Sequence, residues 1–277
     1  IVPQCFSAMM ANTYDGTQWT NFGIMGDLGC NMGWIPTMGI QQDAADWKDM
    51  LGSKSIIMFG CNYAETNKQE MHFVFDAQEA GAKVIVVDPR CSRTAAKADW
   101  WIPIRPGTDA ALVAGIAHEL IKSDMVDLDF LHTYCVGYDE ETLPQGAPAN
   151  SSYYAYVMGT GYDNIPKTPE WAAPICGLPS EKITYLAHFI TDHETCFITQ
   201  GFGPQRRHNG EWNAAAIAAL PVITGNIGRA GTCPGLNGKG MQMNFDGGMW
   251  NSVPIGENPV TKKISISGRF NAMDHPL

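Results

Sequence analysis

Lys83-Val-Ile-Val-Val-Asp-Pro-Arg90 is the stretch that decides the fold of this 277-residue chain. Its branched apolar residues run without polar alternation, which is typical of a parallel strand covered on both faces, and the run ends at Asp88 and Arg90. In open α/β sheets ligands bind beyond the carboxyl ends of the strands, where a carboxylate suits ribose hydroxyls and an arginine suits phosphate. The stretch therefore predicts a ligand site at the end of a buried strand.

A second stretch, Trp101-Ile-Pro-Ile-Arg-Pro-Gly-Thr-Asp109, contains a Pro-Gly turn and leads into an apolar stripe at helical spacing. We predict a short strand over 100–104 and a helix from about residue 108 to 123. Arg105 and Asp109 then flank the turn, and with Asp88 they predict a site for a nucleotide-like ligand. A simpler role is also open for Asp109, because an acid in the first turn stabilises a helix by about 0.3–1 kcal/mol.

The rest of the pattern predicts an α/β fold with a mostly parallel sheet flanked by helices. A strand over 55–60, a helix that ends near residue 80 and the strand after Lys83 form a right-handed βαβ unit. Residues 124–179 read as short helices and loops that cover the sheet, and Ser180 is predicted to cap a helix. A strand over 196–200 precedes a helix over 211–223, which Pro221 should kink or end. We predict one α/β domain over 1–195 and the start of a second α/β region over 196–277.

Composition excludes several classes of protein. The formal net charge of −10 argues against a general nucleic-acid binder, which needs a basic surface. None of the eight cysteines forms a Cys-x-x-Cys pair, so the spacing predicts neither a zinc ribbon nor an iron–sulfur cluster within this sequence. The seven histidines show no metal-ligand spacing, and His118 is predicted to lie on the surface. No apolar run reaches the length of a membrane-spanning helix.

Five motifs, in this order along the chain, resemble successive motifs of the dimethyl sulfoxide reductase family. They are Met58-Phe-Gly-Cys-Asn-Tyr-Ala-Glu-Thr66, Val86-Val-Asp-Pro-Arg90, Arg105-Pro-Gly-Thr-Asp109, Gln200-Gly-Phe-Gly-Pro-Gln-Arg206 and Leu220-Pro-Val-Ile-Thr-Gly-Asn-Ile-Gly228. The members of that family are catalytic subunits that carry molybdenum, or tungsten, bound by two pyranopterin guanine dinucleotides. The resemblance implies the Rossmann-like central domains of the family, and in it the acid that matches Asp109 recognises the guanine base.

The resemblance also implies which residues contact the cofactor. The implied cofactor-binding set is Gly60, Cys61, Asn62, Glu65, Thr66, Val87, Asp88, Pro89, Arg90, Arg105, Gly107, Asp109, Gly201, Gly203, Gln205, Gly225 and Asn226. Arg206 or Arg207 would line the substrate funnel, and Arg206 is our catalytic candidate. Taken alone, Gly60 and Asn62 would fit an ordinary turn, and a solvated pair of arginines would be the commoner situation.

The glycine-rich segment within residues 1–40 has little periodicity and is predicted to be a loop. In the resembled family the protein ligand to molybdenum lies on the loop before the Met58 strand, which places Asp27 at that position. Cys30 is the alternative ligand, because a thiolate is a good soft donor. Both residues also have simpler roles, Asp27 as a turn or cap residue and Cys30 as a small buried one.

The function implied is two-electron oxygen-atom transfer, or hydroxylation, in part of a molybdenum oxidoreductase of anaerobic respiration. The branch most resembled has Ser where this chain has Asp27, so a nitrate-, chlorate- or selenate-type reductase remains an alternative. A nicotinamide dehydrogenase would need a Gly-x-Gly-x-x-Gly fingerprint, which is not met at Gly201. A nucleotide-binding module without catalysis is the alternative from another class.

The sequence is expected to be an internal fragment, inactive alone, of a longer protein. A small-molecule substrate, an iron–sulfur electron-transfer subunit and a membrane-anchor subunit are implied as partners, with no nucleic acid. A 4Fe–4S cluster would belong to the part before Ile1. Export in folded form to the periplasm or cell envelope is likewise implied by the resemblance.

Overall fold

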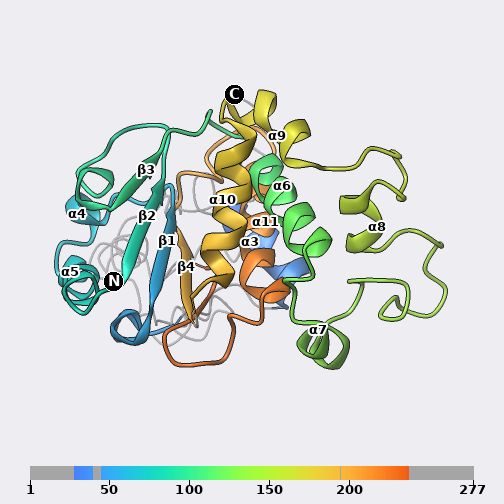
Figure 1. Ribbon diagram of the computed structural model, residues 1–277, viewed down its shortest axis with the longest axis horizontal. Helices are drawn as coiled ribbons and strands as arrows, with labels where there is room; N and C mark the ends of the chain where they lie inside the picture. The colour runs from blue at the N-terminus through green and yellow to red at the C-terminus, as the bar shows by residue number, and fades with distance from the viewer. Residues whose placement is uncertain (1–27, 40–44, 194, 237–277) are drawn as a thin grey trace, which may run out of the picture. The chain divides into compact units, whose positions relative to one another are not determined.

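The computed structural model describes residues 28–39, 45–193 and 195–236. These residues belong to one compact unit, Asp27–Gln242. Its centre is a sheet of five parallel strands in the order β3-β2-β1-β4-β5 (Figure 1). The strands are β1 Ser55–Phe59, β2 Lys83–Val87, β3 Trp100–Ile102, β4 Cys196–Gln200 and β5 Cys233–Pro234. The predicted α/β class with a mostly parallel sheet is confirmed.

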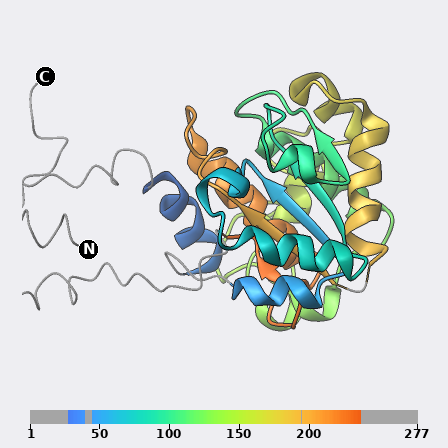
Figure 2. The same ribbon diagram turned by 90° about the vertical axis from the view of Figure 1, so that its left-hand side faces the viewer.

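Helices connect the strands and cover both faces of the sheet, as Figures 1 and 2 show. The α-helices are α3 Leu28–Met38, α4 Tyr63–Thr66, α5 Met71–Glu79, α6 Asp109–Lys122, α7 Leu128–Tyr134, α8 Tyr153–Met158, α9 Pro169–Cys176, α10 Ser180–Thr191 and α11 Gly210–Ile223. Two 3-10 helices, η1 Trp47–Gly52 and η2 Ala95–Lys97, complete the described elements. The predicted strands and the helix after the Pro-Gly turn are present, whereas β5 was not predicted.

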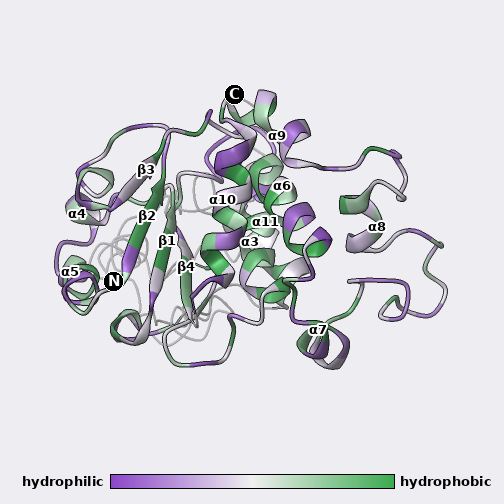
Figure 3. Cartoon of the chain, in the orientation of Figure 1, coloured by the Kyte–Doolittle hydropathy of each residue, from purple (hydrophilic) through white to green (hydrophobic). Residues whose placement is uncertain are grey.

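The uninterrupted apolar runs arise because both faces of the sheet are buried. Successive side chains of a strand point to opposite faces, so each strand supplies two cores. Ile57 and Ile85 pack with α6, α10 and α11, while Ile56 and Val84 pack with η1 and α5 on the other face. Figure 3 shows the resulting hydrophobic strands between helices of mixed character.

The predicted domain boundary near residue 195 does not separate two sheets. β4 pairs with β1 in register from Ser55 and Cys196 to Phe59 and Gln200, so this later strand belongs to the same sheet and lies between β1 and β5. Local sequence cannot reveal this because the pairing joins residues about 140 positions apart, and the order of strands is a tertiary property. The point between β1 and β4, where the strand order reverses, is where open α/β sheets bind ligands.

The glycine-rich segment that we predicted to be a loop is helical from Leu28 to Met38. Glycine lowers helix propensity, so this sequence shows little intrinsic preference for a helix. The helix is instead stabilised by packing: a Cβ at Gly33 would collide with the backbone oxygen of Glu211, which means that α3 lies directly against α11. Trp34 is fully buried in the same contact, beside Ala214.

Three local predictions need correction. Pro179 is the N-cap of α10, and Ser180 is its first residue, with no side-chain cap. His118 is buried rather than exposed, and burial lowers its pKa. The helix over Pro221 does not end there but continues to Ile223, since the fixed φ of proline fits a helix and only the one backbone bond of its missing N–H is lost.

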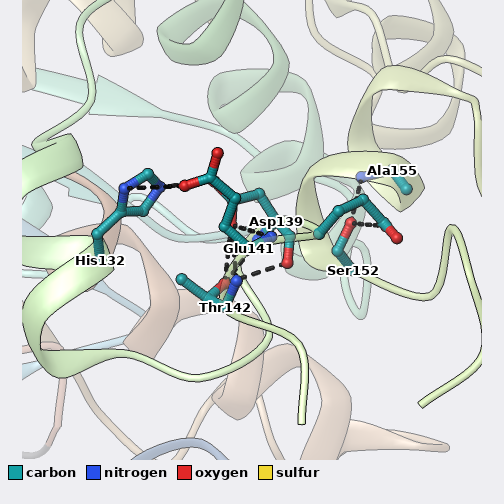
Figure 4. A network of polar contacts seen from close by, with 7 residues as sticks. His132, Asp139, Glu141, Thr142, Ser152 and Ala155 are labelled. Atoms are coloured by element: carbon teal, nitrogen blue, oxygen red, sulfur yellow. Dashed lines mark hydrogen bonds and ion pairs between the residues drawn. The ribbon is translucent and has the colours of Figure 1, made fainter. Parts of the chain in front are cut away.

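Residues 124–179 form an arm with three short helices that pack on other helices: α8 and α9 contact α6, and α7 contacts α11. In Figure 1, α7 and α8 extend away from the strands. A polar network fixes the loop between α7 and α8 (Figure 4). His132 Nε2 lies 2.7 Å from Asp139 Oδ2, and Asp139 Oδ1 accepts hydrogen bonds from the backbone N–H groups of Glu141 and Thr142, each 3.1 Å. Ser152 caps α8 and donates to Glu140.

This network predicts a local pH dependence. Hydrogen bonding to Asp139 raises the pKa of His132, and the bond from His132 helps to lower the pKa of Asp139. Because the pKa of His132 is raised on folding, this pair stabilises the loop at pH values below about 6.5, the ordinary histidine pKa, and the stabilisation is lost as pH rises through the raised pKa. Because the pKa of Asp139 is lowered on folding, its contribution is lost only when pH falls below the ordinary aspartate pKa of about 3.9. We therefore expect the loop to be most protected between about pH 4 and 6.

Hydrogen–deuterium exchange, corrected for the intrinsic rate at each pH, would measure this protection for residues 139–142. Protection should fall between pH 6 and 8 in the natural protein and should be low and constant in His132→Gln. Equal profiles in the two proteins would contradict the prediction.

Candidate nucleotide site at the carboxyl edge

Four loops meet where the parallel strands end. The backbone bonds continue past the strands: Gly60 N–H donates to Val87 O at 2.8 Å, Gly201 N–H to Phe59 O at 2.8 Å, and Asp88 N–H to Ile102 O at 3.1 Å. The loops after β1, β2, β3 and β4 are therefore neighbours at one edge of the sheet. Most of the predicted cofactor-binding residues belong to these loops.

The glycines of the β1 and β4 loops are required by the contact between the loops themselves. A Cβ on Gly201 would lie 2.5 Å from Gly60 O, and one on Gly203 would lie 2.9 Å from the same atom. Gly60 has a φ of +54°, and a Cβ there would lie 2.5 Å from Pro204 Cδ. These three glycines thus let two loops meet at the point where the strand order reverses.

Two carboxyl groups lie at this edge. Asp109, the first residue of α6, is only 4% exposed, and burial raises its pKa to about 6, helped by the negative charge of Asp88. A hydrogen bond from its own backbone N–H and the positive charge of Arg207 both lower the pKa of Asp109. Asp88 is half-buried after β2; burial raises its pKa, and its Oδ1 accepts a hydrogen bond from Arg90 N–H at 2.8 Å. The described residues form no ion pair with either carboxylate, so both are available to donors of a ligand.

The turn after β1 forms its own polar network. Asn62 donates to Glu65 and accepts from Thr94 Oγ1 at 3.2 Å, and Glu65 pairs with Arg93 at 3.2 Å. Thr66 Oγ1 donates to Asn62 O. These side chains lie at the predicted edge, but they bind one another, and neither Thr94 nor Arg93 was among the predicted residues.

Cys61 is buried, and its Sγ donates to Phe59 O at 3.2 Å. Burial raises the pKa of this thiol to about 12, so it is protonated and unsuited to bind metal. Val87 is buried at the end of β2, whereas Pro89 and Arg90 are exposed.

Arg105 does not face the carboxylates. Its Nη1 donates to Pro174 O and Ile175 O, each at 2.8 Å, which are the unpaired carbonyls at the end of α9. A cation at a helix C-terminus is favourable, so this arginine joins the arm to the sheet. The cofactor role predicted for Arg105 stays a prediction. The structure adds a structural contact that the sequence did not indicate, because α9 lies about 70 residues later.

The β4 loop carries the remaining predicted residues. Gln205 is buried, and its side chain lies where a Cβ on Gly29 would be, so this loop contacts the first turn of α3. The guanidinium of Arg206 lies 5.7 Å from the centre of the Phe202 ring. The next residue, Arg207, lies over Gly107, and its positive charge lowers the pKa of Asp109. The sequence offered both arginines for the substrate funnel and favoured Arg206 as the catalytic candidate, which stays a prediction.

Asp27 lies outside the described residues, and Cys30 is part of α3. Their predicted role as metal ligands stays a prediction. Among the described residues, no group of three or more His, Cys, Asp or Glu side chains is arranged to hold a metal ion.

Gly225 and Asn226 lie at the opposite edge of the sheet from the other predicted residues. Asn226 Oδ1 accepts a hydrogen bond from Cys196 N–H, the first backbone donor of β4, at 3.1 Å, and its Nδ2 donates to Thr224 Oγ1 at 3.0 Å. They are at this edge because α11 returns the chain from the carboxyl to the amino ends of the strands. The structure thus separates both residues from the candidate site and gives Asn226 a structural role.

Asn226→Ala tests that role. The variant leaves the buried Cys196 N–H without an acceptor, so we expect the free energy of unfolding to fall by about 1–3 kcal/mol. Chemical denaturation measures the loss, and nucleotide analysis should show an unchanged ligand content per folded molecule. Loss of ligand without loss of stability would instead support the binding role predicted from the sequence.

Comparison with known proteins identifies the family. A family model described as molybdopterin oxidoreductase matches residues 5–274. The chain belongs to the molybdopterin oxidoreductase family.

Relatives within this molybdopterin oxidoreductase family include several dimethyl sulfoxide reductases. The chain is 45% identical over 238 residues to the putative dimethyl sulfoxide reductase chain YnfE of Escherichia coli, which covers 84% of this chain and 29% of the relative. It is 47% identical over 223 residues to the dimethyl sulfoxide reductase DmsA of Haemophilus influenzae, and the match covers 79% of this chain and 27% of that relative. The chain thus spans less than a third of these curated relatives.

A solved structure shares the fold. Acetylene hydratase from Pelobacter acetylenicus superposes with a TM-score of 0.60 at 23% sequence identity, and the match covers 80% of this chain and 28% of that one.

The described helices include none that is both long and apolar enough to cross a membrane.

Proposed function

We propose that the chain is part of the catalytic subunit of a molybdenum-dependent oxidoreductase of the dimethyl sulfoxide reductase type, and that its carboxyl edge binds a guanine nucleotide of the pyranopterin cofactor. Asp109 carries the proposal. A buried carboxylate that forms no ion pair with the described residues lowers the stability of the folded protein. A ligand that supplies hydrogen-bond donors to this carboxylate is therefore favoured. Guanine offers two adjacent donors, N1–H and the exocyclic amine, whereas adenine offers a different pattern.

The residues present fit such a ligand. Asp109 would accept from the guanine base, and Asp88, at the end of β2, would accept from ribose hydroxyls. Gly60, Gly201 and Gly203 keep the β1 and β4 loops in close contact at the same edge of the sheet. When bound, the molybdenum centre would supply two-electron redox chemistry, with oxygen-atom transfer as the proposed reaction.

The wider assignments follow from the same proposal. Asp27, or Cys30 in its place, would ligate the metal, and Asp27 keeps a nitrate-, chlorate- or selenate-type substrate, or a hydroxylation, as the second candidate. An iron–sulfur cluster in a preceding segment, iron–sulfur and membrane-anchor partner subunits, and a place in anaerobic respiration at the cell envelope are proposed for the whole protein. The names of the relatives, which describe dimethyl sulfoxide reductases, support the reductase assignment. The other assignments rest on the resemblance of the sequence motifs.

Cofactor analysis of the full-length protein tests the function. We expect molybdenum or tungsten, and about two guanine nucleotides per metal after acid hydrolysis. A matured sample with neither metal nor pterin would favour the nucleotide-binding module without catalysis. Asp27→Ala should abolish turnover while the nucleotide remains; unchanged turnover would transfer the ligand assignment to Cys30, for which Cys30→Ala is the matched variant.

A further inference from the structure

Arg207 joins the β4 loop to the turn before α6. Its Cβ and Cγ atoms each lie 3.5 Å from the position that a Cβ on Gly107 would occupy, so the aliphatic part of the arginine covers this turn. Gly107 has a φ of +79°, a conformation that favours glycine and exposes the backbone to this contact. The guanidinium is therefore held beside the segment that carries Asp109.

The charged group of Arg207 is exposed and has no hydrogen bond or ion pair within the part of the chain that the structure describes. Other arginines are used structurally: Arg105 binds carbonyls at the end of α9, and Arg93 pairs with Glu65. Arg207 is near enough to Asp109 to affect its ionisation, yet the two do not form an ion pair. A cation thus lies within electrostatic reach of a buried carboxylate without forming an ion pair with it.

A ligand with hydrogen-bond donors at one end and anionic groups at the other would satisfy both residues. A guanine nucleotide has this chemistry, since its base donates and its phosphates accept from the planar fork of a guanidinium. We propose that Arg207 binds the phosphate groups of the nucleotide whose base is recognised by Asp109. The assignment rests on the proposed function and goes beyond it by naming the phosphate-binding residue.

The neighbouring Arg206 provides a matched control. It has the same charge and is also exposed, but its guanidinium lies over the Phe202 ring rather than over the turn at Gly107. Exposure and charge alone would give the two arginines equal effects, whereas the proposed contact assigns the effect to Arg207.

The experiment compares Arg207→Gln, Arg207→Lys and Arg206→Gln in the full-length, cofactor-loaded protein. The rate at which guanine nucleotide is released in mild denaturant is measured by acid hydrolysis of the retained fraction. Because a hydrogen bond to a charged group contributes about 1.5–3 kcal/mol, we expect release to be about 10- to 100-fold faster in Arg207→Gln. Arg207→Lys should be intermediate, since lysine keeps the charge but cannot bind phosphate through two parallel bonds. Arg206→Gln should release nucleotide at the natural rate.

Equal release from Arg207→Gln and the natural protein would overturn the assignment, as would equal acceleration by the two glutamine variants. Complete rescue by lysine would also overturn it, because arginine would then act only as a positive charge near Asp109. Failure of the proposed function is distinguishable from these outcomes, since the natural protein would then contain no guanine nucleotide.

Discussion

Asp109→Asn should remove most of the guanine nucleotide from the full-length protein while making the protein without cofactor more stable. Asparagine has the same shape, but its amide replaces one acceptor oxygen by a donor that opposes the donors of guanine. Loss of one hydrogen bond to a charged group, about 1.5–3 kcal/mol, and loss of the charge from the acceptor of the second predict about a 100-fold loss of affinity. Nucleotide content per protein, measured after acid hydrolysis, should fall below about a tenth of the natural value.

The stability change has the opposite sign because the carboxylate is buried. A carboxyl pKa raised to about 6 means that the folded state loses stability as pH rises from the ordinary value of about 3.9 to 6, and the penalty stays constant above that. Its size at neutral pH is about 3 kcal/mol at most. Denaturation of protein prepared without cofactor should therefore show Asp109→Asn to be more stable at pH 7 and equal near pH 4.

Asp76→Asn is the matched control, because Asp76 is exposed on α5 and is not at the carboxyl edge. It should leave the nucleotide content unchanged. If Asp109→Asn retained its nucleotide, Asp109 would be a helix-stabilising acid and not a base-binding residue. If it also destabilised the protein at pH 7, the burial argument itself would be wrong.

Gly201→Ala should disrupt the centre of the site. The new Cβ would lie 2.5 Å from Gly60 O and 3.3 Å from Cys61 Cα, and both neighbours are backbone atoms that cannot rotate away. The β1 and β4 loops must then separate. Overpacking of this kind costs about 1–3 kcal/mol. We expect a lower free energy of unfolding and a nucleotide content reduced several-fold, measured by chemical denaturation and acid hydrolysis.

Gly52→Ala tests whether alanine at any glycine has this effect. A Cβ on Gly52 would make an ordinary contact, 3.4 Å from Gly231, and its backbone does not need positive φ. That variant should be nearly neutral in both measurements. A Gly201→Ala protein that matched it would show that the two loops are not held as closely as described.

The sequence by itself determined four of the five strands, the βαβ unit and the carboxylates at the sheet edge. These features are local: a branched apolar run forms a buried strand, and a turn directly after it places Asp88 at the strand's end. Asp109 could be predicted for the same reason, because a Pro-Gly turn and an apolar stripe define where α6 begins. The motifs that resembled the family were also continuous in sequence, and the family match confirmed that resemblance.

Tertiary structure decided which arginine lies by the carboxylates and which glycines are near the site. Arg105 donates hydrogen bonds to carbonyls of α9, whereas the β4 loop places Arg207 over Gly107. Asn226 follows α11 and therefore lies at the opposite edge of the sheet. Each outcome depends on segments that are distant in sequence. The helix at Gly33 has the same origin, since its low propensity is overcome only by close packing on α11. Local patterns determine where an element begins and ends, whereas the partner of a side chain depends on which elements the fold brings together.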